Sequence, residues 1–188
     1  MGVKMNKAVF LDRDGTINVD KGYLYKIEDF EFIDRVPEAI RIMKHLGYLV
    51  IVLSNQSGIA RGYFREEDVL KLHCYMNKEL EKMGAAIDKF YFCPHLPDGI
   101  IARYRCQCIC RKPAIGMLQW ALRDFSIDLE ESWVVGDRER DLFLDFEAPI
   151  KRILLTRNYG QKETGNRINI RNDLWEFAQR DLLNNLKC

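Results

Sequence analysis

The sequence predicts an α/β fold, a doubly wound parallel sheet of the Rossmann-like type with helices on both faces. Two observations support this class. Apolar runs of strand length alternate along the chain with segments of helical periodicity, which is the rhythm of consecutive β-α-β units. The run at 48–54 is apolar almost throughout, as in a strand covered on both faces. With 188 residues, the chain is expected to form one domain over 1–188, with a loose N-terminal tail at 1–6.

The individual elements follow from local signals. A helix is expected at 37–47, because proline stands in its first turn and glycine at its end. A long amphipathic helix at 66–83 ends before Gly84. A further helix opens at Pro113 or Gly116 and runs to 124, and a last one covers 174–183. The strands are expected at 8–11, 48–54, 89–92, 132–136 and 151–155.

Bulk composition excludes several classes of protein. The chain is 47% hydrophobic and 30% charged, which is typical of globular proteins and not of disordered ones. Its net charge of +1 gives no strong field toward nucleic acid or membranes. The longest apolar run is far too short to cross a bilayer, and the N-terminus lacks the apolar core of a signal peptide. We therefore expect a cytoplasmic protein with reduced thiols and no nucleic-acid or membrane partner.

The most informative feature lies directly after the first predicted strand. Asp12 and Asp14 are two positions apart, so on an extended segment both carboxylates face the same way. Gly15 then lets the backbone turn. Two carboxylates that share a site repel each other unless a cation or a reacting phosphate lies between them. The pair therefore predicts a metal-dependent or phosphoryl-transfer site, although an Asp-Gly turn without chemistry is the simpler alternative.

Other chemically suited residues also follow predicted strands. Hydrolysis of a phosphomonoester through a covalent intermediate needs a nucleophile, an acid, cations for the phosphoryl oxygens and a divalent metal. Because ligands of open α/β sheets bind beyond the carboxyl ends of the strands, residues at these ends should converge. Ser54-Asn55 could instead cap a helix, Lys112 could be a solvated charge, and Asp141 is open between a metal contact and a supporting or capping role. Candidates for this site are Asp12, Asp14, Ser54, Asn55, Lys112, Asp137 and Asp141.

These motifs carry a family resemblance over residues from about 7 to 160. The chain resembles the haloacid dehalogenase superfamily without a cap domain and, more narrowly, the D-glycero-D-manno-heptose 1,7-bisphosphate phosphatase group, which also includes histidinol-phosphate phosphatases. The segments that carry it are Phe10-Leu11-Asp12-Arg13-Asp14-Gly15-Thr16-Ile17-Asn18, Ser54-Asn55-Gln56-Ser57-Gly58-Ile59-Ala60-Arg61-Gly62, Cys93-Pro94-His95, Cys108-Ile109-Cys110-Arg111-Lys112-Pro113 and Gly136-Asp137 with Asp141.

The resemblance implies a role for each motif. Asp12 would be the nucleophile that forms an aspartyl-phosphate, and Asp14 the general acid and later the base. Mg²⁺ would be held by Asp12, the main-chain carbonyl of Asp14, and Asp137. The phosphoryl group and substrate would be bound by Ser54, Asn55, Arg111 and Lys112. The group commonly has lysine where this chain has Arg138, which keeps the charge but presents it as a rigid fork, so that its contact with phosphate is an expectation.

The cysteines are unevenly distributed. Cys93-x-His95 and Cys108-x-Cys110 are separated by twelve residues, and three thiolates with one imidazole suit a closed, structural zinc site. Cys106 adds a further thiol to this stretch, but the family pattern selects Cys108 and Cys110. Such a zinc loop at 93–112 would carry Arg111 and Lys112 toward the active site. The alternative is a group of reduced cysteines without metal.

The intervals between motifs leave no room for a cap domain, so the active site should be open. Our leading hypothesis is Mg²⁺-dependent removal of the 7-phosphate of D-glycero-D-manno-heptose 1,7-bisphosphate, a step toward lipopolysaccharide or other heptose glycans. The alternatives are a histidinol-phosphate phosphatase and a zinc-stabilised binding protein without catalysis. The basic residues between 99 and 119 are better explained by an anionic sugar bisphosphate than by nucleic acid. We expect a monomer.

Overall fold

The computed structural model describes residues 5–143, 145–156 and 168–184, and it contains a six-stranded sheet in the order β3-β2-β1-β4-β5-β6. All neighbouring strands pair in parallel. The order runs outward in both directions from the centre, which confirms the doubly wound α/β fold and places a switch point between β1 and β4. The strands are β1 (Ala8–Leu11), β2 (Leu49–Asn55), β3 (Lys89–Cys93), β4 (Trp133–Gly136), β5 (Lys151–Leu155) and β6 (Asn169–Arg171).

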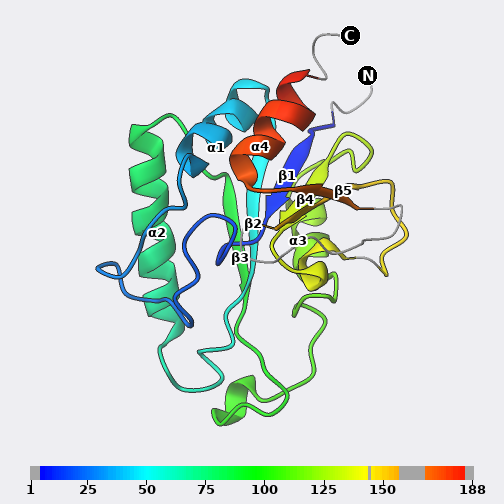
Figure 1. Ribbon diagram of the computed structural model, residues 1–188. Coiled ribbons are helices and arrows are strands. Elements are labelled where there is room, and N and C mark those ends of the chain that lie inside the picture. The colour runs from blue at the N-terminus through cyan, green and yellow to red at the C-terminus, as the bar shows by residue number, and fades with distance from the viewer. Residues whose placement is uncertain (1–4, 144, 157–167, 185–188) are drawn as a thin grey trace.

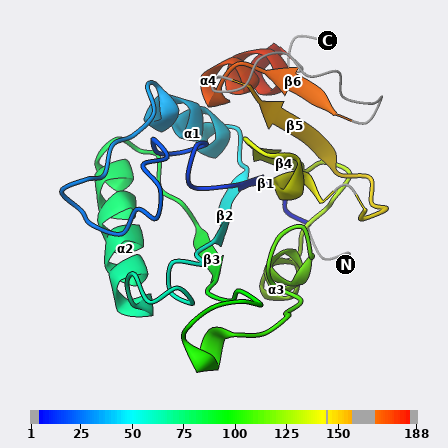
Figure 2. The ribbon, with the colours of Figure 1, turned by 60° about the horizontal axis from the view of Figure 1, so that its bottom comes forward.

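Helices cover both faces of this sheet, as Figures 1 and 2 show: α1, α2 and α4 lie on one face and α3 lies on the other. The α-helices are α1 (Val36–His45), α2 (Glu66–Lys82), α3 (Gly116–Asp124) and α4 (Leu174–Phe177). Short helical turns are η1 (Ala102–Tyr104) and η2 (Glu139–Leu142), and a π-helical segment η3 (Ala178–Leu183) continues α4. In the described part of the chain, no helix has the length and apolar character needed to span a bilayer.

The central strand β1 shows why the sheet has two cores. Its residues are all buried, with Val9 and Leu11 packed in the cluster that includes α1 and α2. Phe10 belongs to the second cluster, which includes α3. This alternation follows from the two-residue period of a strand. Because β1 has apolar neighbours on both faces and strands on both edges, its carboxyl end is held firmly.

Most predicted elements are confirmed within one or two residues. The strand β6 was missed, because Asn169-Ile170-Arg171 has no apolar run and lies at the edge of the sheet. The helix expected at 174–183 is α4 followed by η3. Within the predicted tail, residues 1–4 lie outside the described residues, whereas Asn6 forms a β-bridge with Ile127.

Two long connections leave the carboxyl edge of the sheet. One joins β1 to α1 through 12–35, and the other joins β3 to α3 and contains η1. In Figure 1 this second connection extends beyond the sheet at the bottom of the molecule. Neither is a separate folded unit, which confirms the absence of a cap over the described residues. The site at this edge is therefore formed by loops.

Candidate active site and metal-binding loop

Asp12 stands at the carboxyl end of β1, next to a buried lysine. Its backbone N–H donates to the carbonyl of Val135 on β4 at 3.1 Å. Its Oδ1 lies 2.6 Å from Nζ of Lys112, whose side chain is 1% exposed. Lys112 also lies 2.8 Å from Oδ1 of Asp141 and donates to the carbonyl of Leu53 at 2.5 Å. One ammonium group thus holds together residues from β1, β2 and η2.

Asp12, Asp137 and Asp141 place carboxylate oxygens within 4.8 Å of one another. Burial raises the pKa of Asp12 to about 7, although Lys112 opposes the shift. Burial also raises the pKa of Asp137 to about 6, with a further contribution from Asp141. The buried Oδ1 of Asp137 has no hydrogen-bond partner among the described residues. An excess of carboxylate oxygens with one atom unpartnered fits a hard divalent cation such as Mg²⁺.

The backbone at Gly15 brings the first loop against Asp137. Gly15 has a φ of +87°, and a Cβ there would lie 2.4 Å from Oδ2 of Asp137. Both observations require glycine at this position, the first because L-residues rarely adopt this conformation and the second because no side chain fits. Gly15 therefore permits the close approach of two strand ends.

Asp14 differs from Asp12 in its surroundings. Nε and one terminal nitrogen of Arg13 lie 2.9–3.1 Å from both carboxylate oxygens of Asp14. Asn18 Nδ2 and Gln56 Nε2 each donate to it at 3.0 Å. Although burial alone would raise the pKa of Asp14, the charge and hydrogen bonds of Arg13 hold it below the ordinary value. The two aspartates of the motif therefore have opposite electrostatic environments.

Ser54 and Asn55 lie at the end of β2, on the same edge of the sheet. Ser54 is 1% exposed, and its Oγ accepts a hydrogen bond from Gln56 Nε2 at 2.7 Å. The Asn55 amide donates to the backbone carbonyl of Lys112 at 3.1 Å and accepts from its N–H at 3.0 Å. Asn55 thus fixes the backbone of Lys112 to the sheet.

Asp12, Asp14, Asn55 and Asp141 border a cavity of about 360 Å³. Arg138 lies on its wall, 3.2 Å from Asp20 and 3.7 Å from Asp137. Among the described residues, no carboxylate lies within ion-pair distance of the three other arginines of the wall. The wall includes Asp12, Asp14, Asp20, Tyr23, Asn55, Gln56, Arg61, Arg111, Arg138, Arg140 and Asp141. The cavity thus offers unpaired guanidinium groups beside the carboxylate cluster.

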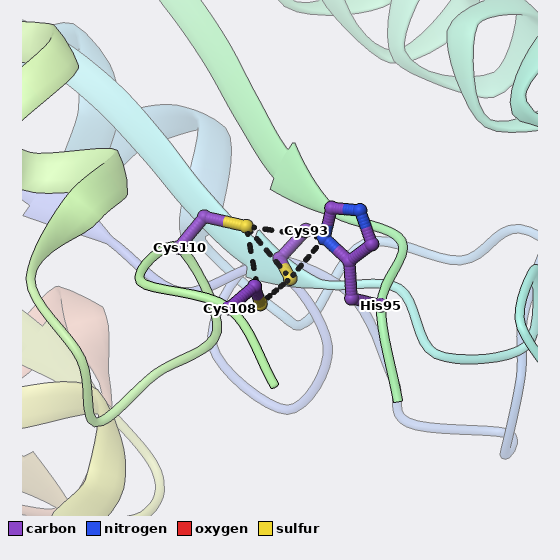
Figure 3. Close-up of side chains that lie close together, drawn as sticks. All are labelled: Cys93, His95, Cys108 and Cys110. Carbon is purple, nitrogen blue, oxygen red and sulfur yellow. Dashed lines mark hydrogen bonds between the residues drawn. The ribbon is translucent and has the colours of Figure 1, made fainter. Parts of the chain in front are cut away.

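The predicted zinc ligands Cys93, His95, Cys108 and Cys110 come together, as Figure 3 shows. The separations are 3.1 Å for Cys93–Cys110, 3.4 Å for Cys108–Cys110, 3.5 Å for Cys93–Cys108, and 3.3 Å and 3.6 Å from His95 Nδ1 to Cys110 and Cys93. The edge of a zinc tetrahedron with 2.3 Å zinc–sulfur bonds is about 3.8 Å, slightly longer than these separations, so the four donors lie close enough together to hold one zinc ion. Cys106 is exposed and outside the cluster.

The cluster is continuous with the active site. The contact with Cys93, reinforced by His95 and Cys108, lowers the pKa of the Cys110 thiol and favours the thiolate that binds metal. Arg111 and Lys112 follow Cys110 directly, and Arg111 donates to the carbonyl of His95 at 3.4 Å. A metal held here would fix the backbone that delivers Lys112.

The structure also shows residues to which the sequence assigned no role. Arg13 and Gln56 contact Asp14, and Asp20 pairs with Arg138. Arg13 is completely buried, although a charged residue next to a turn is ordinarily exposed. Local sequence patterns carry no signal for these pairings, because each depends on how loops fold back on the sheet.

The haloacid dehalogenase class of phosphatases is defined by a parallel sheet with Asp-x-Asp after its central strand. In this class a buried lysine lies against the first aspartate, and two more aspartates follow the adjacent strand. Residues 7–148 match the family described as polynucleotide kinase 3 phosphatase. The D-glycero-beta-D-manno-heptose-1,7-bisphosphate 7-phosphatase of Haemophilus influenzae is 45% identical over 161 residues, covering 86% of each chain. The D-glycero-alpha-D-manno-heptose-1,7-bisphosphate 7-phosphatase of Campylobacter jejuni is 46% identical over 157 residues, covering 84% of this chain and 86% of the relative.

A solved structure gives the same result. The D,D-heptose 1,7-bisphosphate phosphatase of B. bronchiseptica, complexed with magnesium and phosphate, superimposes with a TM-score of 0.82 at 30% identity, covering 95% of this chain and 99% of that one. The chain therefore belongs to the polynucleotide kinase 3 phosphatase family and, within it, to the D-glycero-D-manno-heptose-1,7-bisphosphate 7-phosphatases.

Proposed function

We propose that the protein hydrolyses the 7-phosphate of D-glycero-D-manno-heptose 1,7-bisphosphate and releases heptose 1-phosphate and inorganic phosphate. The observation that carries this proposal is the junction of Asp12, Lys112 and Asp141 beside Asp137 at one wall of an arginine-lined cavity. The relatives with this activity cover most of the chain, which supports the same substrate class.

Asp12 is the proposed nucleophile. Its carboxylate attacks phosphorus, and the bond from phosphorus to the sugar oxygen breaks as the aspartyl-phosphate forms. Asp14 donates a proton to the departing oxygen, and its carboxylate then takes a proton from the water that attacks the aspartyl-phosphate. Lys112 balances the charge on Asp12 and is placed to contact the phosphoryl oxygens, beside Ser54 and Asn55.

Asp12, the main-chain carbonyl of Asp14, and Asp137 are the proposed ligands of Mg²⁺. When bound, the cation supplies positive charge that offsets repulsion between the carboxylates and the incoming phosphate. The unpartnered Oδ1 of Asp137 supports this assignment. Asp141 supports Lys112 at 2.8 Å and accepts from the backbone N–H of Arg138 at 3.1 Å, so we assign it a supporting role.

A second phosphate on the substrate would account for the arginines that line the cavity without a carboxylate partner. Arg61, Arg111 and Arg140 line the cavity, and in the described ranges none of them has a carboxylate partner. A guanidinium on a cavity wall without a counter-charge favours an anion. Histidinol phosphate has only the phosphate that reacts at Asp12, so it would leave these groups without a partner.

An activity panel with Mg²⁺ tests the substrate. Phosphate release is measured from both anomers of the heptose bisphosphate, from heptose 7-phosphate and from histidinol phosphate. We expect at least about tenfold higher kcat/KM for one bisphosphate anomer than for the monophosphate, because the distal phosphate gains charged hydrogen bonds worth about 1.5–3 kcal/mol. Faster turnover of histidinol phosphate would contradict the proposal.

The remaining proposals concern the zinc loop, the cellular location and the oligomeric state. Cys93, His95, Cys108 and Cys110 are the proposed ligands of one structural Zn²⁺, because all four donors are protein atoms. A cluster of reduced thiols of this kind is typical of a reducing compartment, which supports a cytoplasmic location. We also propose that the protein has no nucleic-acid or membrane partner and is a monomer, and sedimentation of the zinc-loaded protein tests its oligomeric state.

A further inference from the structure

Arg13, the residue between the two aspartates, has the most restrained side chain near the site. It is completely buried. Its guanidinium binds both oxygens of Asp14 at 2.9–3.1 Å and donates to the carbonyl of Leu24 at 2.8 Å. The other terminal nitrogen lies 3.4 Å from Nε2 of His73, whose ring stacks on Phe90 with centroids 4.5 Å apart. Because Asp14, the Leu24 carbonyl and His73 all contact this planar guanidinium, it can bind the Asp14 carboxylate in only one orientation.

Further donors restrain the same carboxylate from other elements. Asn18 donates to Oδ1 and Gln56 to Oδ2, each at 3.0 Å. Gln56 is 3% exposed and also donates to Ser54 Oγ at 2.7 Å. Rotation of Asp14 would break contacts with several groups at once, while 23% of its side chain remains exposed toward the cavity. The carboxylate is therefore fixed from behind and open in front.

The contact with Leu24 connects this arrangement to the substrate side of the cavity. Leu24 belongs to the loop between β1 and α1, and the preceding residue Tyr23 lines the cavity. One guanidinium thus spans the acid and the backbone of a loop that faces the substrate. The hydrogen bond from Arg13 to the Leu24 carbonyl would not be needed if Arg13 served only to neutralise Asp14.

We propose that Arg13 is a positioning residue, which orients Asp14 toward the leaving oxygen and ties that orientation to the loop at Leu24. This rests on the proposed function, in which Asp14 transfers the proton. In that step the bond from phosphorus to the leaving oxygen breaks, the bond to Asp12 forms, and the proton of Asp14 passes to the leaving oxygen. Arg13 binds the carboxylate of Asp14 and acts on the leaving oxygen only through that carboxylate.

Leaving-group dependence tests the proposal. A sugar alkoxide needs a proton as it departs, whereas p-nitrophenolate departs without one, and kcat/KM reports the steps up to this departure. For Arg13→Lys, which keeps the charge and loses the fork, we expect kcat/KM to fall about 30-fold with heptose bisphosphate, because general acid catalysis contributes about 10²–10⁴-fold. With p-nitrophenyl phosphate we expect less than about a threefold fall. The ratio between substrates cancels any change in the folded fraction.

Three further variants complete the test. Gln56→Met leaves the Arg13–Asp14 ion pair intact and should change the substrate ratio in the same direction by a smaller factor. Arg123→Lys is the matched control, because Arg123 is 73% exposed on α3, and it should change neither rate. Equal falls with both substrates for Arg13→Lys would overturn the positioning role. Asp14→Asn separates this proposal from the proposed function. If that variant lowers kcat/KM by the same factor with heptose bisphosphate and with p-nitrophenyl phosphate, the assignment of Asp14 as the general acid is itself wrong.

Discussion

The part of the chain that the structure describes contains two clusters of side chains that could hold a metal ion, and they are assembled in different ways. Asp12 and Asp137 follow two neighbouring strands at the centre of the sheet, more than a hundred positions apart in the chain. Cys93 is the last residue of β3, and His95, Cys108 and Cys110 come from the connection between β3 and α3. The first cluster has oxygen donors and a buried ammonium group beside them, and the second has sulfur and nitrogen donors alone.

This difference suits the carboxylate cluster to a chemical role and the thiol cluster to a structural one. Asp12 and Asp141 of the carboxylate cluster line a cavity, and the neighbouring Asp137 has an unpartnered oxygen, so a cation held there could also meet a substrate. The thiol cluster offers four protein donors, which would fill the four positions of a tetrahedral zinc ion and leave none for water. Lys112, two residues after Cys110, joins them. The loop cluster therefore places a residue that the sheet cluster needs.

Asp12→Asn makes the largest expected change to the carboxylate cluster. An amide is a poor nucleophile, so we expect kcat to fall by at least about 10⁴-fold. Zinc content should be unchanged, because Asp12 is outside the thiol cluster. Single-turnover assays with heptose bisphosphate, together with metal analysis, provide the measurement. Retained turnover would contradict the nucleophile assignment.

Cys110→Ser tests whether the loop cluster supports the sheet cluster. We expect loss of most zinc, a thermal midpoint lower by about 10 °C, and kcat/KM lower by more than about 10²-fold, because the backbone before Lys112 loses its anchor. Metal analysis, calorimetry and activity are measured on one preparation. Cys106→Ser is the matched control, since Cys106 is exposed and outside the cluster. Similar behaviour of the two variants would show that the cluster holds no metal.

Gly15→Ala tests the close approach at Asp137. The new Cβ would lie 2.4 Å from Oδ2, so either Asp137 or the loop must shift, and we expect kcat/KM to fall about 10- to 100-fold. Gly47→Ala is the control, because its φ of +79° imposes similar backbone strain with nothing within 4 Å. Gly47→Ala should lose about 1 kcal/mol of stability from backbone strain alone, and Gly15→Ala should lose more, because the overlap with Asp137 adds to the same strain. Equal activity of the two would show that Asp137 tolerates displacement.

The smallest expected effect is the pH dependence of Mg²⁺ binding. The pKa of Asp12 is raised to about 7 and that of Asp137 to about 6, so both carboxylates gain protons as the pH falls through this range. Because Mg²⁺ must displace these protons, we expect its affinity to be at least about tenfold weaker at pH 5.5 than at pH 7.5. Titration calorimetry measures this. Equal affinities would argue against Asp12 and Asp137 as ligands.

The sequence predicted most of the fold because its signals are local. The apolar runs of β1 and β2 are visible in the order of residues alone. The strand β6 was not predicted, because an edge strand of three residues acquires its structure from its neighbour β5. The cysteine and histidine spacing, together with the family resemblance that selected Cys108 and Cys110 over Cys106, predicted which four donors meet in space.

By itself, the sequence determined the Asp12-x-Asp14 pair, the parallel sheet that places strand ends along one edge, and a group of thiols and one imidazole suited to zinc, within which the family resemblance selected Cys108 and Cys110. These follow from the two-residue period of strands and from ligand chemistry. Only the tertiary structure decided that Lys112 lies between Asp12 and Asp141 and that the buried Arg13 forms an ion pair with Asp14. The partner of a charge depends on how distant loops close over it, and no local pattern encodes that closure.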